Sequence, residues 1–343
     1  MSNWLTQFEV LYSLLESQSG KPKSIMMIPR SKAALRAITI LFLVGVSLAP
    51  AQVTLVATDA SGVSSFANAG HWSDGAAPSG TKDYVDAIGI MRTPDATGAS
   101  FTFAGNSLTL GNGTTSGVTL AIKAQTAGAV INVASLYLNF GMVSESGTSL
   151  SDTLTGGVTL LAGGGIFDAA TRTLAVGSAI GGSGGLTAQS TGGAGTVQLT
   201  HAGNTYSGGT SVLSGTLDVR QDGALGSGNV SVASGATLKL ELGSASDYIA
   251  DSANLLLSGS AAVNLNFTGS DTIGALSLDG GATYAALGTW GGLSSSAQNK
   301  SSLFTGTGVF TVTAVPEGSV AFLFLSGLGM LGLGAIYKRQ RLA

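Results

Sequence analysis

The sequence predicts an all-β protein built as a sandwich, a barrel or a β-solenoid, and three observations support this. Only 10% of the residues are charged and 52 of 343 are glycine, yet 44% are apolar, which suits a packed chain with many short turns. No amphipathic helical pattern occurs between residues 52 and 313. Short apolar/polar alternations bounded by Gly, Asn, Ser or Thr occur instead, at 107–111, 117–123, 129–140, 157–163 and 171–177.

Composition also limits the chemistry and the partners. The chain has no cysteine, so it can form neither a disulfide nor a cysteine-based metal site, and we expect no cofactor. Residues 52–316 carry 7 basic and 15 acidic side chains, a net charge of 7 − 15 = −8. No basic patch is then available to neutralise phosphates, so a nucleic-acid partner is not expected.

Residues 1–51 read as a leader ending in a secretory signal peptide. A basic stretch with Arg30, Lys32 and Arg36 precedes the apolar run 38–49 (ITILFLVGVSLA), and Ala49-Pro50-Ala51 forms a cleavage site, with Ala49 and Ala51 as its small residues. Twelve apolar residues are too few to span a bilayer core of about 30 Å. Met26 or Met27 would be a more natural start than Met1.

The next segment, 52–105, is expected to hold an N-terminal cap and the first coils. Its stretch HWSDGAAPSGTKDYVDAIGI is richer in aromatic and charged residues than the chain that follows. Repeat proteins need such atypical ends, because each repeat otherwise packs only on its neighbours.

The body, 106–270, contains one stretch whose sequence favours a solenoid over a sandwich or a barrel. In 181–242 the strands TVQL, TSVL, TLDV, NVSV and TLKL recur every 6 to 13 residues between Gly-rich corners. The elements NTYSGGT, SGTL and ALGSGNV resemble the autotransporter-associated β-strand repeat, in one clear copy. That signature lies in Asn204, Tyr206, Gly208, Gly209, Gly215, Leu217, Ala224, Leu225, Gly226 and Gly228.

The resemblance implies a right-handed parallel β-helix on a bacterial surface. Glycine permits the sharp corners of such a coil, and alternating Val, Leu and Ile fill a narrow core. Asn204 and Asn229 would stack at corners and satisfy backbone groups. At about 22 residues per coil, roughly 12 coils would stack at ~4.8 Å.

Residues 271–313 are expected to be closing β coils, with Trp290 covering the end. Autotransporter passengers precede a membrane barrel, and no such barrel follows here, so self-transport is not expected.

The last segment, 314–343, ends in an apolar run and a basic tip. Val320–Tyr337 is 18 uncharged residues, which predicts a transmembrane helix at 319–337, and Lys338, Arg339 and Arg341 would stay cytoplasmic. With Val315, Pro316 and Glu317 this resembles the PEP-CTERM sorting signal, although Gly318 stands where a second proline is usual. The resemblance implies Sec export, transient inner-membrane anchoring and exosortase cleavage; a plain C-terminal anchor is the alternative.

Candidate catalytic and binding residues are few. Asp218, Arg220 and Asp222 have the i, i+2, i+4 spacing that shares one face of a strand, and mutual pairing is the competing interpretation. Asp83 and Asp86 near Tyr84 form a weaker set. His71 beside Trp72 is interpreted as a cap-packing pair rather than a sugar platform, and His201 as a turn or surface residue. The Gly-rich run 181–185 lacks the Asp that would bind calcium.

We therefore expect an exported, non-enzymatic cell-surface or extracellular-matrix protein, structural or adhesive, with exopolysaccharide as a possible partner. The alternative is a carbohydrate-binding or polysaccharide-degrading protein on the same fold, for which three or more charged groups should converge beside exposed aromatics. A repeat relic with a marginal fold is a third possibility.

Overall fold

The structure is a computed structural model, and it describes residues 52–148 and 150–316. Within these ranges all named elements are strands, and none of the same residues form a helix long and apolar enough to cross a bilayer. The predicted signal segment 1–51 and the predicted transmembrane helix 319–337 lie outside the described residues.

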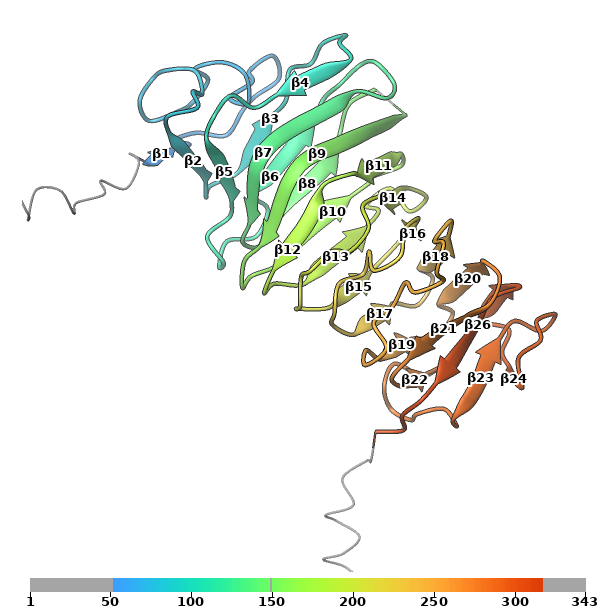
Figure 1. Cartoon of the computed structure of the whole chain (residues 1–343). Coiled ribbons are helices and arrows are strands. Elements are labelled where there is room, and N and C mark those ends of the chain that lie inside the picture. The colour runs from blue at the N-terminus through green and yellow to red at the C-terminus, as the bar shows by residue number, and fades with distance from the viewer. Residues whose placement is uncertain (1–51, 149, 317–343) are drawn as a thin grey trace, which may run out of the picture. The chain divides into compact units, whose positions relative to one another are not determined.

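A thirteen-stranded parallel sheet forms one side of the fold (Figure 1). Its main path runs in chain order, and β12 and β4 pair beside it with β9 and β7. The strands of the path are β1 (Gln52–Thr54), β2 (Asp83–Asp86), β5 (Ser107–Leu110), β7 (Val130–Leu138), β9 (Ser151–Leu160), β11 (Thr173–Val176), β14 (Thr196–Leu199), β16 (Thr216–Val219), β18 (Thr237–Glu241), β20 (Ala262–Asn266) and β25 (Phe304–Gly306), with β4 (Ser100–Thr102) and β12 (Ala179–Gly182) beside them.

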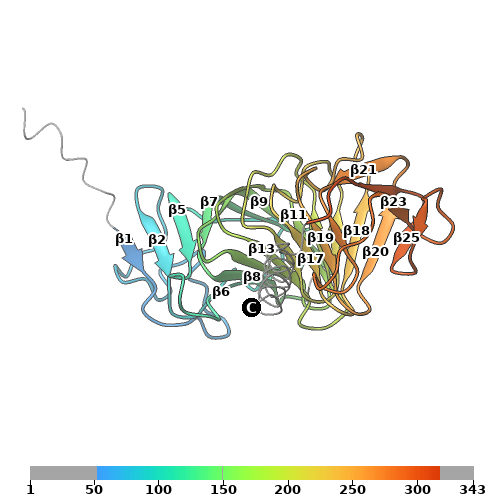
Figure 2. The same ribbon diagram turned by 90° about the horizontal axis from the view of Figure 1, so that it is seen from below.

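A nine-stranded parallel sheet forms the other side, and the chain alternates between the two sheets (Figure 2). Its strands are β3 (Ile90–Arg92), β6 (Thr119–Ile122), β8 (Gly141–Glu145), β10 (Gly165–Asp168), β13 (Leu186–Gln189), β15 (Thr210–Val212), β17 (Val230–Val232), β19 (Leu255–Leu257) and β22 (Leu276–Ser277). The predicted all-β parallel solenoid is confirmed. Nine strands in one sheet give about eight turns, so the expected 12 coils were too many. The reason is that the two ends consume chain in irregular segments: 31 residues separate Gln52 from its partner Asp83.

Stacked inward columns explain why this sequence closes into a solenoid. On the thirteen-stranded sheet, Leu154, Val176, Leu199, Val219, Leu240 and Leu265 occupy one register position on successive strands, and all are fully buried. Each such side chain contributes roughly 1.5–3 kcal/mol through burial of apolar surface. The outward positions between them carry threonine, glutamine, asparagine and charged residues, which is the alternation that the sequence shows.

Glycine is required at the corners where adjacent turns touch. Gly226 has φ +65, and a Cβ there would clash with the Tyr206 carbonyl oxygen of the preceding turn. Any other residue would meet both backbone strain and a steric conflict at this position.

The N-terminal segment caps the solenoid with aromatic packing. Trp72 and Tyr84 meet edge-on with ring centroids 4.8 Å apart, and Tyr84 meets Phe103 edge-on at 5.4 Å. Phe66 adds a fourth ring, 5.4 Å from Phe103. β1 and β2 continue the parallel ladder, so this cap grows out of the first turns.

The C-terminal segment forms a small sheet of its own, with β21 (Ser270–Ile273), β26 (Val309–Val312), β23 (Gly288–Gly291) and β24 (Asn299–Lys300). β23 runs antiparallel to β26, unlike the parallel pairs of the two large sheets. Trp290 lies in β23 and packs, partly buried, against the core. The closing segment therefore adds a mixed sheet to the last parallel strands.

Candidate functional site

The residues of the predicted repeat signature lie in the fold's interior and at its corners. Asn204 is buried; its Oδ1 accepts from the Ile180 backbone N–H at 2.9 Å and its Nδ2 donates to the Ala224 carbonyl at 2.8 Å. Asn229 Oδ1 accepts from the Asn254 backbone N–H at 2.9 Å. Both asparagines therefore satisfy backbone groups of neighbouring turns, a structural role.

Tyr206 belongs to the same structural set. Its ring is fully buried, and its hydroxyl lies 2.6 Å from Thr210 Oγ1, one corner away. Burial raises the pKa of this phenol, so it stays neutral over the working range of pH. Leu217, Ala224 and Leu225 are fully buried beside it.

Asp218 and Arg220 share a face, as their spacing predicted, and two residues of the next turn complete a charge cluster. Lys239 Nζ lies 2.8 Å from Glu241 Oε1 and 3.9 Å from Asp218 Oδ1. Arg220 approaches Asp218 at 4.0 Å and Glu241 at 3.8 Å. Two acids and two bases therefore neutralise one another on the outer face of β16 and β18.

The electrostatics of this cluster favour structural pairing. Burial raises the pKa of the Asp218 carboxyl, Glu241 raises it further, and Lys239 and Arg220 oppose both effects. The pKa of Glu241 is lowered although burial opposes this, because its hydrogen bonds to Lys239 and Asn266 stabilise the carboxylate. The competing interpretation of mutual pairing fits these distances. Neither of the two cavities described below includes the four side chains.

Asp222 does not join them, because β16 ends at Val219 and the chain turns away. Its carboxylate accepts backbone N–H groups of Ala245 at 2.8 Å and Asp247 at 3.0 Å. The pKa of Asp222 is lowered by these bonds, against an opposing effect of burial. It organises the loop that follows β18.

His71 and Trp72 take part in the cap. Trp72 is buried and its Nε1 donates to the Ser65 carbonyl at 2.6 Å, so it offers no face to a sugar. His71 Nδ1 lies 3.2 Å from Asp59 Oδ1, and Ser65 Oγ donates to the same oxygen at 2.6 Å. A nucleophilic serine would contact the imidazole instead, so this Asp–His–Ser group is arranged to hold the cap together.

The weaker acidic set is also structural. Tyr84 is buried, and its hydroxyl accepts from the Ser79 N–H at 2.9 Å. Asp83 accepts from Asn106 and Ser107 at 2.7 and 2.6 Å. Burial raises the pKa of Asp86, which accepts two backbone N–H groups in the turn after β2.

His201 follows β14 and is half-buried. In the described part of the chain its Nδ1 has no hydrogen-bond partner. Among the same residues, no group of three or more His, Asp or Glu side chains is arranged to hold a metal ion.

Two acids that sequence reasoning missed face into the core. Glu145 ends β8 two residues after the inward Val143, and Asp152 on β9 shares a register position with the inward Leu174 of β11. Burial and the neighbouring Asp152 raise the pKa of Glu145 to about 8, and Arg172 partly offsets this. The i+2 spacing from Val143 to Glu145 is the one sequence signal for this inward position.

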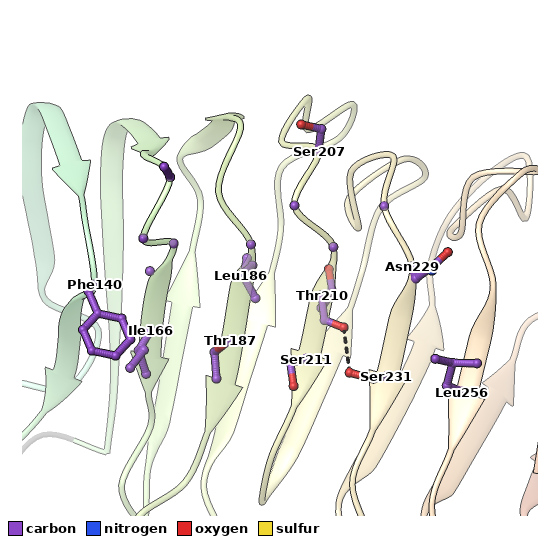
Figure 3. Close-up of a pocket in the computed structure, with 18 residues that line it drawn as sticks. Phe140, Ile166, Leu186, Thr187, Ser207, Thr210, Ser211, Asn229, Ser231 and Leu256 are labelled. Atoms are coloured by element: carbon purple, nitrogen blue, oxygen red, sulfur yellow. Dashed lines mark hydrogen bonds between the residues drawn. The ribbon is translucent and has the colours of Figure 1, made fainter. Parts of the chain in front are cut away.

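A groove of about 670 Å³ lies on the outer face of the nine-stranded sheet (Figure 3). Ile166, Thr187, Ser211, Ser231 and Leu256 form its floor, at one register position on five successive strands. Phe140 stands at one end. The glycines of the β9–β10, β12–β13, β14–β15 and β16–β17 corners form one wall, Gly208, Gly209 and Gly228 of the repeat signature among them.

A second cavity of about 150 Å³ lies by the N-terminal cap. Arg92, Asp95, Asn68 and Lys123 line it, and Lys123 Nζ donates to the Ser146 carbonyl at 2.8 Å. Burial is the main reason why the pKa of Lys123 is lowered, and the neighbouring Arg92 adds to it.

Of the predicted sorting and cleavage residues, the structure describes only two. Val315 is exposed and Pro316 half-buried, directly after the last strand. Ala49, Ala51, Glu317, Lys338, Arg339 and Arg341 lie outside the described residues.

No protein-family model, curated protein or solved structure shows significant similarity to this chain. Its function must therefore be argued from the fold and the surface described above.

Proposed function

We propose that the chain is an exported, non-enzymatic protein of the cell surface or extracellular matrix, with a structural or adhesive role. The observation that carries this proposal is the regular row of hydroxyls that the parallel solenoid presents on its thirteen-stranded sheet. Thr173, Thr196, Thr216 and Thr237 form one outward column on the thirteen-stranded sheet, with one hydroxyl per turn. Such a surface offers the same contact repeatedly at about 4.8 Å intervals, which suits multivalent attachment.

The pairing of the charged candidates supports a role without catalysis. Asp218 and Glu241 are held by Arg220 and Lys239, so they stabilise adjacent turns. We also propose that the solenoid is right-handed, because about 98% of crossovers between parallel strands of one sheet are right-handed.

Export and sorting form the second half of the proposal. The patterns at 1–51 and 314–343 favour delivery by Sec, brief anchoring in the inner membrane and processing by an exosortase. Val315 is 45% exposed where the motif begins, and this accessibility supports processing there.

Cell fractionation with intact-mass analysis tests the proposal, on the native chain, a Glu317→Ala variant and an Asp251→Ala control. We expect the native chain and the control to lose both ends and to reach the surface or medium, while Glu317→Ala stays in the inner membrane. A native chain that keeps residues 314–343 and stays in that membrane would refute the surface role.

A carbohydrate-binding protein is the second candidate, and the groove on the nine-stranded sheet is the observation that favours it. A polysaccharide-degrading version would need charged groups converging in that groove, and its lining has none.

A further inference from the structure

We propose that the groove on the nine-stranded sheet binds an uncharged polysaccharide chain lying along the solenoid axis, across successive strands. This inference deepens the proposed surface role and rests on it, since it names what the exported protein would hold. The argument uses the floor of the groove, its glycine wall, its lack of charge and Phe140.

The floor of the groove presents hydroxyls in a row. Thr187, Ser211 and Ser231 are half-buried neighbours on β13, β15 and β17, between the apolar Ile166 and Leu256 (Figure 3). The strand step of about 4.8 Å is comparable with the length of one pyranose unit. A chain of sugars crossing the strands would therefore meet one hydroxyl per sugar, with an apolar contact at each end.

These hydroxyls are largely available to a ligand. Within the described part of the chain, the one side-chain hydrogen bond of these three floor hydroxyls runs from Ser231 Oγ to the Thr210 carbonyl, at a weak 3.4 Å. Asn229 is exposed at the wall, and its Nδ2 adds an amide donor above the floor.

The wall is low because adjacent turns approach too closely for side chains. A Cβ at Gly208 would lie 2.8 Å from the Gly184 carbonyl oxygen, and one at Gly209, where φ is +86, would lie 2.8 Å from the Asn229 carbonyl oxygen. A Cβ at Gly228 would lie 2.7 Å from the Ser207 carbonyl oxygen. The same glycines that allow the turns to stack thus leave the groove open along several strands.

The absence of charge selects the class of polymer. None of the groove's lining residues is Asp, Glu, Lys, Arg or His. The described part of the chain carries a net charge of 7 − 15 = −8, so it offers no attraction to a polyanion. A neutral, hydroxyl-rich chain needs no countercharge and can exchange its water contacts for those of serine, threonine and asparagine.

Phe140 supplies the aromatic surface that sugar recognition uses. It is 40% exposed at the end of the groove and has φ +68, a left-handed conformation that is unusual for a bulky residue. The Phe140 N–H is fixed by the Gly164 carbonyl at 2.8 Å. A residue with a strained backbone and an exposed aromatic ring beside a cavity points to a contact with a ligand, here the apolar face of a sugar.

A polypeptide strand fits this groove less well. Strand addition needs a free sheet edge, whereas the backbone of the floor is already used in the parallel ladder, as in Thr210 N–H to Asn229 carbonyl at 2.8 Å. Side-chain hydroxyls are what remains, and they match a glycan better than a peptide.

Affinity electrophoresis of the full chain in gels containing hydroxyethylcellulose or galactomannan tests the proposal, with alginate as the anionic comparison. The groove variant is Thr187→Ala/Ser211→Ala/Ser231→Ala. The matched control, Ser61→Ala/Ser116→Ala/Ser294→Ala, removes three exposed hydroxyls that lie outside both the groove and the threonine column of the other sheet. We expect a neutral glycan to retard the native chain and the control, and the groove variant to bind roughly tenfold or more weakly.

Phe140→Gly is the second variant, because glycine suits the left-handed conformation and the change should not impair folding. We expect it to weaken retardation as well. Equal retardation of native, groove and control chains would overturn the proposal, as would retardation by alginate alone or by no glycan. Saturable binding of unfolded casein that only the groove variants lose would reassign the groove to a protein partner. Glycan binding is measured on purified chain, so its failure is distinct from a failure of the export experiment.

Discussion

Gly208→Ala is expected to destabilise the solenoid strongly, because the wall of the groove is built on backbone contact between turns. The new Cβ would clash with Gly185 N and the Gly184 carbonyl carbon, and it would lie 2.8 Å from the Gly184 oxygen. An ordinary contact begins at 3.4 Å, so the two turns would have to separate by at least 3.4 − 2.8 = 0.6 Å. No flexible side chain is available to absorb that shift.

The magnitude follows from the rigidity of the neighbours. Overpacking costs typically 1–3 kcal/mol, and a clash against backbone alone places Gly208→Ala near about 3 kcal/mol. For a domain of this size we expect the Tm to fall by roughly 6–12 °C. Thermal unfolding followed by circular dichroism measures it.

Gly177→Ala is the matched control in the same body, since its Cβ would come no closer than 3.5 Å to any atom and its φ is not left-handed. We expect its Tm to lie within about 2 °C of the native value. If Gly208→Ala has the same Tm as Gly177→Ala, the close approach of the turns at the groove wall is refuted.

Three further predictions concern buried polar groups. Burial raises the pKa of the Asp271 carboxyl to about 8, above its value of about 3.9 in the unfolded chain, so the folded state binds a proton that the unfolded state has lost. The free energy of unfolding should therefore fall as the pH rises from about 4 to about 8. Asp271→Asn should flatten this pH dependence in Tm measurements. A native profile that Asp271→Asn leaves unchanged would contradict it. Lys239→Gln should lower the free energy of unfolding in urea by about 1–2 kcal/mol, because the buried Asp218 loses part of its countercharge. Lys82→Gln, in the exposed pair with Asp74, should barely change the stability. Equal effects of the two variants would argue against a stabilising role of the charge cluster. Asn204→Ala should cost about 2–4 kcal/mol, since it leaves the Ile180 N–H and the Ala224 carbonyl without partners, and an unchanged urea midpoint would refute that role.

The architecture could be predicted from local pattern, because a strand's alternation determines which residues face the core. The inward Leu217 and Val219 and the outward Thr216 follow directly from the period of two in TLDV. The same rule placed Asp218 and Arg220 together correctly. It failed for Asp222, since the sequence does not show that the strand ends at Val219.

The groove could not be predicted, because it depends on which residues become neighbours between turns. Phe140 and Leu256 are separated by more than a hundred residues yet line one surface. Glu145 was missed for a different reason: polar residues in an alternating strand are normally assigned to the outside, and this one occupies an inward position at a corner. The number of turns was overestimated because the two ends do not coil regularly.

The constant register of the stacked columns determines which changes in length the chain can tolerate. From Thr196 to Thr216 the repeat is 20 residues, from Thr216 to Thr237 it is 21, and from Thr237 to Ala262 it is 25. The corners vary by five residues while the strand positions stay aligned. Insertions in a loop therefore leave the fold intact, whereas one extra residue within a strand would turn the hydrophobic column of that turn outward. The gene can lengthen or shorten this protein safely by whole turns, and each added turn would extend the hydroxyl row by one position.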